Sequence, residues 1–171
     1  IRLAKDAAEP STFPAADFQT CYLAFASPGS NVTLQLEAVR LLQLGLGDVR
    51  TREGQAEVYS GYVGNLADQV DPAERAKLAA ALAPRFPTAD AELNRELARL
   101  LGMLSANQPS LLANVTAQWS AASSVEDDVH YLIVASLLPG PRSAEVARAT
   151  ATALLGLHAK LDALEQFASR N

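Results

Sequence analysis

The sequence is poor in cysteine and in aromatic residues. Its one cysteine, Cys21, excludes a disulfide within the chain, a cysteine-based zinc site and the CxxCH motif that attaches c-type haem. Aromatic residues make up 6% of the chain although 49% of its 171 residues are hydrophobic, so alanine, leucine and valine supply most apolar side chains. Alanine and leucine are good helix formers. We therefore predict an all-α chain that is long and apolar enough to bury a core.

Basic residues are also in deficit, with 14 lysines and arginines against 19 acidic residues. A surface that binds the phosphate backbone needs clustered positive charge, because counterion release supplies much of the affinity. The basic residues here are scattered among acids, so we expect no nucleic-acid binding. The uncharged stretch 100–125 is long enough to span a membrane, but its amide groups and Pro109 would be costly in lipid. We expect no membrane span.

The N-terminal 30 residues form an irregular segment with one short helix. Pro10, Pro14 and the 27–30 run SPGS interrupt any regular element. Between them, aromatic residues and Cys21 recur at intervals of three and four, which predicts a helix at about 15–26 with this face inward. Cys21 has no neighbouring base or cation, so a buried, unreactive thiol is favoured over a nucleophile.

A second helix is expected from Asn31, which can cap its N-terminus, to the glycines at 45 and 47. Its predicted inward stripe is Leu34, Ala38, Leu41 and Leu42, joined by Val39 and Leu46. The apolar group between 58 and 66 predicts a further helix around 55–68, weakened by its glycines.

The second half of the chain has helix starts near 72, 90, 109, 125 and 143, each marked by a capping residue or proline. The last four of these helices start near 90, 109, 125 and 143. In that order, their predicted inward residues are Leu93, Leu97, Leu100, Leu101 and Leu104; Leu112, Val115 and Trp119; Val129, Leu132, Ile133 and Leu137; and Val146, Ala153, Leu154, Leu157, Leu161 and Leu164. An alternative interpretation of Trp119 is that it anchors an interface with a partner instead of packing in the core.

These starts lie about 18 residues apart, so helix pairs recur about every 36 residues, as in an α-solenoid. The tetratricopeptide consensus is not visible. We therefore predict an all-α, HEAT-like α-solenoid of antiparallel helix pairs over 31–171, within a single domain spanning 1–171. The chain begins without methionine, and we expect it to be part of a longer protein.

Four residues are candidates for interaction, and none is predicted to be catalytic, cofactor-binding or metal-binding. His130 follows Glu126 by one helical turn, but a metal site needs further ligands and His158 is the only other histidine, so a packing role is favoured. His158 can be a contact on an exposed ridge or a surface histidine between repeats. Arg95 and Arg99 can recognise an acidic partner or form local ion pairs within their helix. The chain has no Gly-rich phosphate loop, GxSxG or HExxH motif.

Three stretches, 93–104, 127–133 and 154–161, resemble the HEAT-like helical region of large planctomycete-type secreted proteins. In that family the region is a spacer or scaffold beside a β-propeller dehydrogenase-like domain and a c-type haem domain. The resemblance implies a bacterial, extracytoplasmic origin and a non-catalytic role. The haem motif and the propeller are not in this sequence, so the redox activity of such proteins does not carry over.

The sequence thus favours a non-catalytic protein-interaction or scaffolding domain without a cofactor, whose partner is a protein or a sister domain of the same chain. One alternative is an accessory module that positions a redox domain in a larger protein. Another is a HEAT-like nucleic-acid enzyme of the base-excision kind, which the acidic balance disfavours.

Overall fold

The computed structural model describes residues 15–48 and 61–168, with side chains from 17 to 164 within those ranges. All regular structure in these residues is helical, which confirms the predicted all-α class. Two 3-10 turns, η2 (Ala67–Gln69) and η3 (Ala83–Arg85), accompany the α-helices. The helices are α1 Ala15–Ala26, α2 Val32–Gly45, α3 Pro72–Leu82, α4 Ala91–Met103, α5 Leu111–Thr116, α6 Val125–Leu137 and α7 Ala144–Ala168.

Side-chain caps set most of the helix starts, as the sequence predicts. Asn31, Asp90 and Ser124 each accept a hydrogen bond from the backbone amide three residues on, at 2.9, 2.8 and 3.0 Å. Asp71 and Ser143 do the same for α3 and α7. The first amides of a helix have no partner within it, so each cap satisfies a donor that would otherwise need water.

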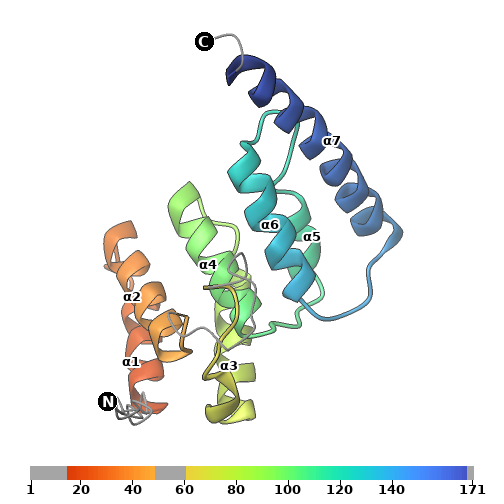
Figure 1. The fold of residues 1–171 in the computed structure, drawn as a ribbon. Helices are drawn as coiled ribbons and strands as arrows, with labels where there is room; N and C mark the ends of the chain where they lie inside the picture. The colour runs from red at the N-terminus through yellow and green to blue at the C-terminus, as the bar shows by residue number, and fades with distance from the viewer. Residues whose placement is uncertain (1–14, 49–60, 169–171) are drawn as a thin grey trace, which may run out of the picture.

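The helices form a row in which the alternate helices α2, α4 and α6 are successive neighbours in space. α2 packs against α1 and α4, α4 packs against α6, and α7 packs against α5 and α6. Figure 1 shows this row running from α1 and α2 at one end to α7 at the other. No sheet or second core interrupts the row within the described residues.

α4 lies at the centre of the core. All five leucines of its predicted stripe, Leu93, Leu97, Leu100, Leu101 and Leu104, are buried. The helix has α2 on one side and α6 on the other, so it buries more than one face. Of the α1 face predicted to point inward, Phe18, Cys21 and Phe25 are buried and Tyr22 is half-buried, and burial raises the pKa of the Cys21 thiol.

The prediction of a helix around 55–68 is wrong for residues 61–68, which contain no α-helix. Residues 55–60 lie outside the part of the chain that the structure describes. Residues 61–66 form turns that lead into η2. Gly61 has a φ of +82°, a conformation that ends a right-handed helix. Gly64 approaches α4 so closely that an added Cβ would lie 3.3 Å from the Met103 carbonyl oxygen. The glycines therefore serve a tight turn against α4.

Three of the predicted inward stripes are partly wrong. On α2, Leu34 and Leu41 are exposed, and Leu36 and Gln43 are buried instead. On α6, the predicted residues Val129, Leu132, Ile133 and Leu137 are only half-buried, because α6 turns Tyr131, Val134 and Ala135 toward the core. Which of two adjacent apolar faces of a helix becomes buried depends on which neighbouring helix packs against it.

The predicted stripe of α7 is buried only at Val146 and Ala153. Leu157 is half-buried, and Leu154, Leu161 and Leu164 are exposed. Figure 1 shows the C-terminal end of α7 extending past the end of α6. Leu154 precedes Lys160, which contacts α6, so Leu154 is exposed because it lies on a side of α7 that α6 does not cover.

α5 also differs from its prediction, because it ends at Thr116 and leaves Trp119 outside it. Leu112 and Val115 are buried as expected. Trp119 is partly buried against the core, and its indole Nε1 donates to the Ala149 carbonyl of α7 at 3.2 Å.

Candidate functional site

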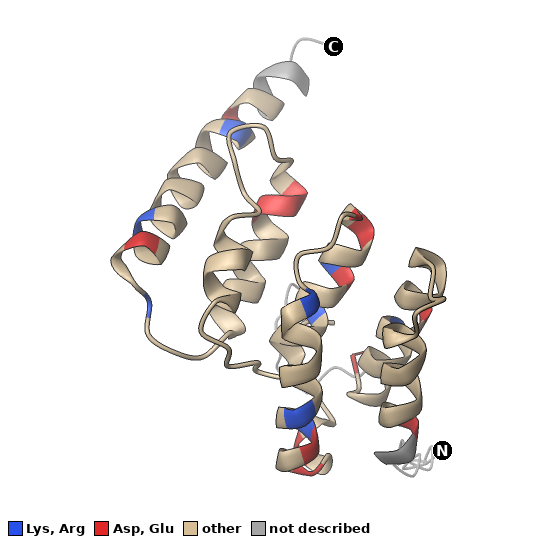
Figure 2. Ribbon diagram, turned by 180° about the vertical axis from the view of Figure 1, so that it is seen from behind, with Lys and Arg blue, Asp and Glu red and all other residues tan. Residues whose placement is uncertain are grey.

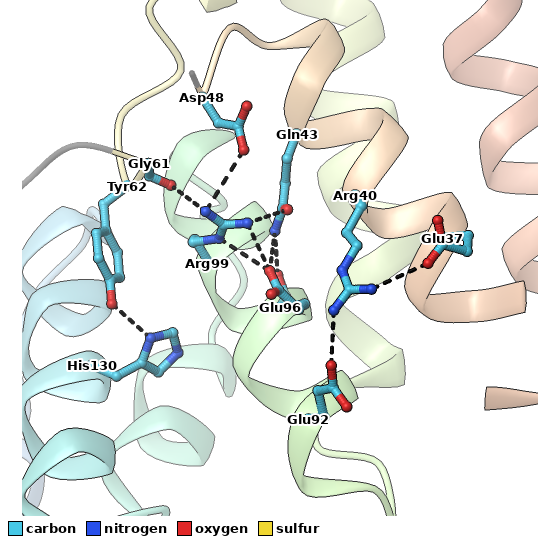
Figure 3. Close-up of polar contacts among 10 residues, drawn as sticks. All are labelled: Glu37, Arg40, Gln43, Asp48, Gly61, Tyr62, Glu92, Glu96, Arg99 and His130. Carbon is cyan, nitrogen blue, oxygen red and sulfur yellow. Dashed lines mark hydrogen bonds and ion pairs between the residues drawn. The ribbon is translucent and has the colours of Figure 1, made fainter. Parts of the chain in front are cut away.

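A polar cluster crosses from α2 to α4 and to the turn at residue 61 (Figure 3). We call Gln43, Asp48, Gly61, Glu96 and Arg99 the Arg99 cluster. Gln43 is fully buried, and its Nε2 donates to the Glu96 backbone oxygen at 2.9 Å and to Glu96 Oε2 at 3.0 Å. The cluster therefore satisfies a buried amide and joins two helices that are distant in sequence.

The Arg99 guanidinium is the centre of this cluster. Its Nε and Nη2 donate to Glu96 Oε2 at 3.1 and 2.8 Å, and Nη2 also donates to Gln43 Oε1. Nη1 donates to the Gly61 carbonyl at 3.3 Å and lies 3.7 Å from Asp48 Oδ2. The side chain is 22% exposed, and each of its guanidinium nitrogens contacts a group of the same chain. Arg99 is thus engaged inside the molecule.

His130 lies on α6, beside the same turn. Its Nδ1 is 2.9 Å from the Tyr62 hydroxyl oxygen, and its ring meets Tyr131 edge-on with centroids 4.8 Å apart. Only 9% of the residue is exposed. Burial lowers the pKa of His130 to about 4, although nearby Glu96 opposes this shift. The imidazole is therefore neutral at pH 7.

The second ring nitrogen of His130, Nε2, is buried and makes no hydrogen bond of good geometry. The nearby Arg95 backbone acts in the direction of a higher His130 pKa, against the larger effect of burial. Burial also raises the pKa of Tyr62, so its phenol keeps its proton. A neutral imidazole beside a phenol can hold a hydrogen bond between α6 and the turn. Its enclosure between Tyr62 and Tyr131 leaves little room for a substrate.

The four candidate residues do not form one site. Arg95, Arg99 and His130 lie on the adjacent helices α4 and α6, whereas His158 lies on α7. Arg95 is 46% exposed and its Nη1 donates to Asp127 Oδ1 at 2.8 Å. His158 is 82% exposed, with Nε2 3.6 Å from Asp162 Oδ2. Within the described part of the chain, no three His, Cys, Asp or Glu residues are grouped to hold a metal ion.

Sequence reasoning missed a buried ion pair between α6 and α7, which we call the Lys160 clamp. The Asp128 carboxylate is 2% exposed and contacts Lys160 Nζ. The same amino group donates to the carbonyl oxygens of Ser120 and Ser123, both at 2.8 Å. Asp128 and Lys160 are 32 residues apart, so no local pattern pairs them.

A groove of about 480 Å³ lies between the loop after α5 and α7. Its walls include Trp119 from the loop and the small residues Ala149, Ala153 and Gly156 from α7, and the Lys160 clamp lies along it. The volume is within the range of small-molecule pockets. The clamp residues satisfy one another, and the other polar residues that line the groove include Glu145, Arg148 and Thr152.

Exposed leucines gather at the two ends of the row of helices, and both groups contain residues expected in the core. The α2 leucine surface consists of Leu34, Leu41 and Leu44, which share one side of the helix; Leu23 on α1 and Val32 at the start of α2 are also exposed. The α7 leucine surface consists of Leu154, Leu157, Leu161 and Leu164; Leu157 is half-buried, and the others range from 43% to 55% exposed. Single exposed leucines are ordinary, but gathered apolar residues mark a surface that another molecule covers.

The charges of the described residues are mixed over the surface. Figure 2 shows the positions of lysines and arginines interspersed with those of acids along the described helices. Most described basic residues form ion pairs with acids of the chain, including Arg40 with Glu92 and Arg95 with Asp127, both at 2.8 Å. No described helix is both long and apolar enough to cross a membrane.

Comparison of the chain with protein-family models, curated proteins and solved structures found no match.

Proposed function

We propose that this chain is a non-catalytic, HEAT-like interaction module that binds another protein or a sister domain of its own chain. The observation that carries this proposal is the pair of exposed leucine surfaces on α2 and α7. Leaving such residues in water forgoes roughly 25 cal/mol for each Å² of apolar surface, and a protein partner recovers it.

The packing order supports the HEAT-like part of the proposal. Helices α2, α4 and α6 are successive neighbours, with α1, α3 and α5 each preceding one of them in the chain. A stack of helix pairs has this order, because each repeat contacts only the repeats beside it. The terminal faces of such a stack stay apolar unless a further element caps them. The two leucine surfaces lie at those ends.

The polar groups support a non-catalytic role. The Arg99 cluster, His130 and the Lys160 clamp all make hydrogen bonds that hold parts of the chain together, and among their buried side-chain atoms only Asp48 Oδ1 and His130 Nε2 have no hydrogen-bond partner. A catalytic centre requires groups that can reach a substrate. The accessory role beside a redox domain stays a prediction.

Photo-cross-linking in the native host tests the proposal. A photoreactive residue at Leu41 reports on the α2 surface and one at Leu154 reports on the α7 surface, with the exposed position Glu126 as a matched control. We expect discrete adducts from one or both leucine positions and none from position 126. Absence of adducts from both leucine positions, or equal adducts from position 126, would contradict the proposal.

A further inference from the structure

The leucines of α7 follow a heptad pattern that its packing within the chain does not use. Leu154, Leu157, Leu161 and Leu164 are spaced by three, four and three residues, which corresponds to the a and d positions of a coiled coil. Leu154, Leu161 and Leu164 are 55%, 43% and 53% exposed, and Leu157 is half-buried. The four therefore form one largely exposed seam along the second half of α7.

The intervals between the four leucines are three, four and three residues, so they read the same from either end of the helix. If a second α7 lies antiparallel with a two-fold axis near residue 159, Leu154 of one copy faces Leu164 of the other. Leu157 then faces Leu161 in the same way. An interface in which one patch meets itself is the isologous contact of two-fold dimers. The leucines at 34, 41 and 44 on α2 are spaced by seven and three residues, so that surface lacks this symmetry.

The charges along the seam do not oppose such pairing. Between 154 and 164 the ionisable residues are His158, Lys160 and Asp162. Lys160 is turned onto Asp128 of its own chain, and Asp162 lies 3.6 Å from His158 on the same helix. A second copy therefore brings no uncompensated row of like charges against the first, which would otherwise disfavour self-association.

We propose that a second copy of this chain covers the α7 leucine surface, in an antiparallel two-fold dimer formed by the seam from Leu154 to Leu164. This inference rests on the proposed function, because it names the partner of one of its two surfaces. A seam of four leucines covers less than the roughly 800 Å² per partner of a standard interface. The dimer is therefore weak, with a dissociation constant on the order of tens of micromolar.

Sedimentation equilibrium of the 171-residue chain tests the dimer. Between about 1 and 500 μM, we expect the mass to rise from 18.1 kDa toward twice that value. Leu161→Glu and Leu154→Glu should each keep the chain monomeric, whereas Leu41→Glu on the α2 surface should not change the association. Circular dichroism checks that each variant is folded. A wild-type chain that stays monomeric throughout, or a dimer that Leu41→Glu dissociates and Leu161→Glu does not, would overturn the inference.

Disulfide trapping in a Cys21→Ala background tests the antiparallel orientation. A mixture of the Leu154→Cys and Leu164→Cys chains should form a mixed disulfide. Leu154→Cys alone should form none, because its two copies are about 15 Å apart along the helix, beyond disulfide reach. A disulfide from Leu154→Cys alone would overturn the orientation. A monomeric chain that still gives adducts with another protein in cells would overturn the dimer and leave the proposed function standing.

Discussion

Arg95 and Arg99 lie one helical turn apart on α4, yet they have different environments. Arg95 is 46% exposed and its side chain pairs with Asp127 on the next helix. Arg99 is 22% exposed and contacts Gln43, Glu96, Asp48 and the Gly61 carbonyl. Burial and the number of partners decide how much each residue contributes to stability.

We predict that Arg99→Ala lowers the free energy of unfolding by about 2 to 3 kcal/mol, because it leaves the buried Gln43 Oε1 without a donor and the Glu96 carboxylate without its cation. Arg95→Ala is the matched control and should cost less than about 1 kcal/mol, because its ion pair is exposed. Urea unfolding of the two variants measures both values. Equal losses would show that the Arg99 cluster contributes no more than a surface ion pair.

His130 makes the stability of the fold depend on pH. Its folded pKa is about 4, below the value of 6.5 for an unperturbed histidine, so the unfolded chain takes up the proton first as pH falls. The stabilising contribution is fully present above about pH 6.5 and is lost between pH 6.5 and 4, and it amounts to about 3 kcal/mol at most.

We therefore expect the urea midpoint of the wild-type chain to fall between pH 6.5 and 4 by more than that of His130→Gln, which cannot titrate. His158→Gln is the control, since His158 is 82% exposed, and it should keep the full wild-type dependence. Because carboxylates also titrate toward pH 4, the difference between variants is the quantity to compare. Parallel curves for wild type and His130→Gln would contradict the prediction.

Among the elements, α7 is attached to the rest of the molecule mainly through its first half and the Lys160 clamp. Val146 and Ala153 are its buried apolar residues, and Lys160 binds Asp128 and the loop before α6. The remaining leucines of α7 make no comparable contact within the described chain. The clamp thus decides whether the second half of α7 stays docked.

Lys160→Met should destabilise the fold by about 3 to 5 kcal/mol, because it leaves the Asp128 carboxylate buried without its cation. Lys77→Met is the control, since the Lys77 ion pair with Glu74 is exposed and 3.9 Å long, and it should cost less than about 1 kcal/mol. Hydrogen exchange should show lost protection in α7 before α4. Uniform loss across both helices would argue against a local clamp.

For the whole molecule, the mixed surface charge predicts weak electrostatic attraction to polyanions. The basic residues of the described chain are mostly paired with acids, and the full sequence has a net charge of -5. Few counterions would be released on contact with a phosphate backbone. In a mobility-shift titration with duplex DNA at about 20 mM salt, we expect no retarded complex. A complex that dissociates as salt is raised would contradict this expectation.

The candidate site was only partly accessible from the sequence. Arg99 and His130 were identified as candidates, but Gln43 and Tyr62, which explain what they do, are 56 and 68 residues away from them. Such pairs form only after the helices have packed. The same holds for the Lys160 clamp, whose partners follow no local periodicity.

The sequence by itself determined the all-helical class and where most helices begin. A cap such as Asn31 or Asp90 bonds to an amide three residues away, so its effect is complete within one turn. Only the tertiary structure decided which apolar faces are buried. The stripe of α4 was predicted correctly because helices flank it on two sides, whereas Leu161 of α7 is equally periodic and remains exposed. Periodicity shows that a helix has an apolar face, but burial requires a neighbour to cover it.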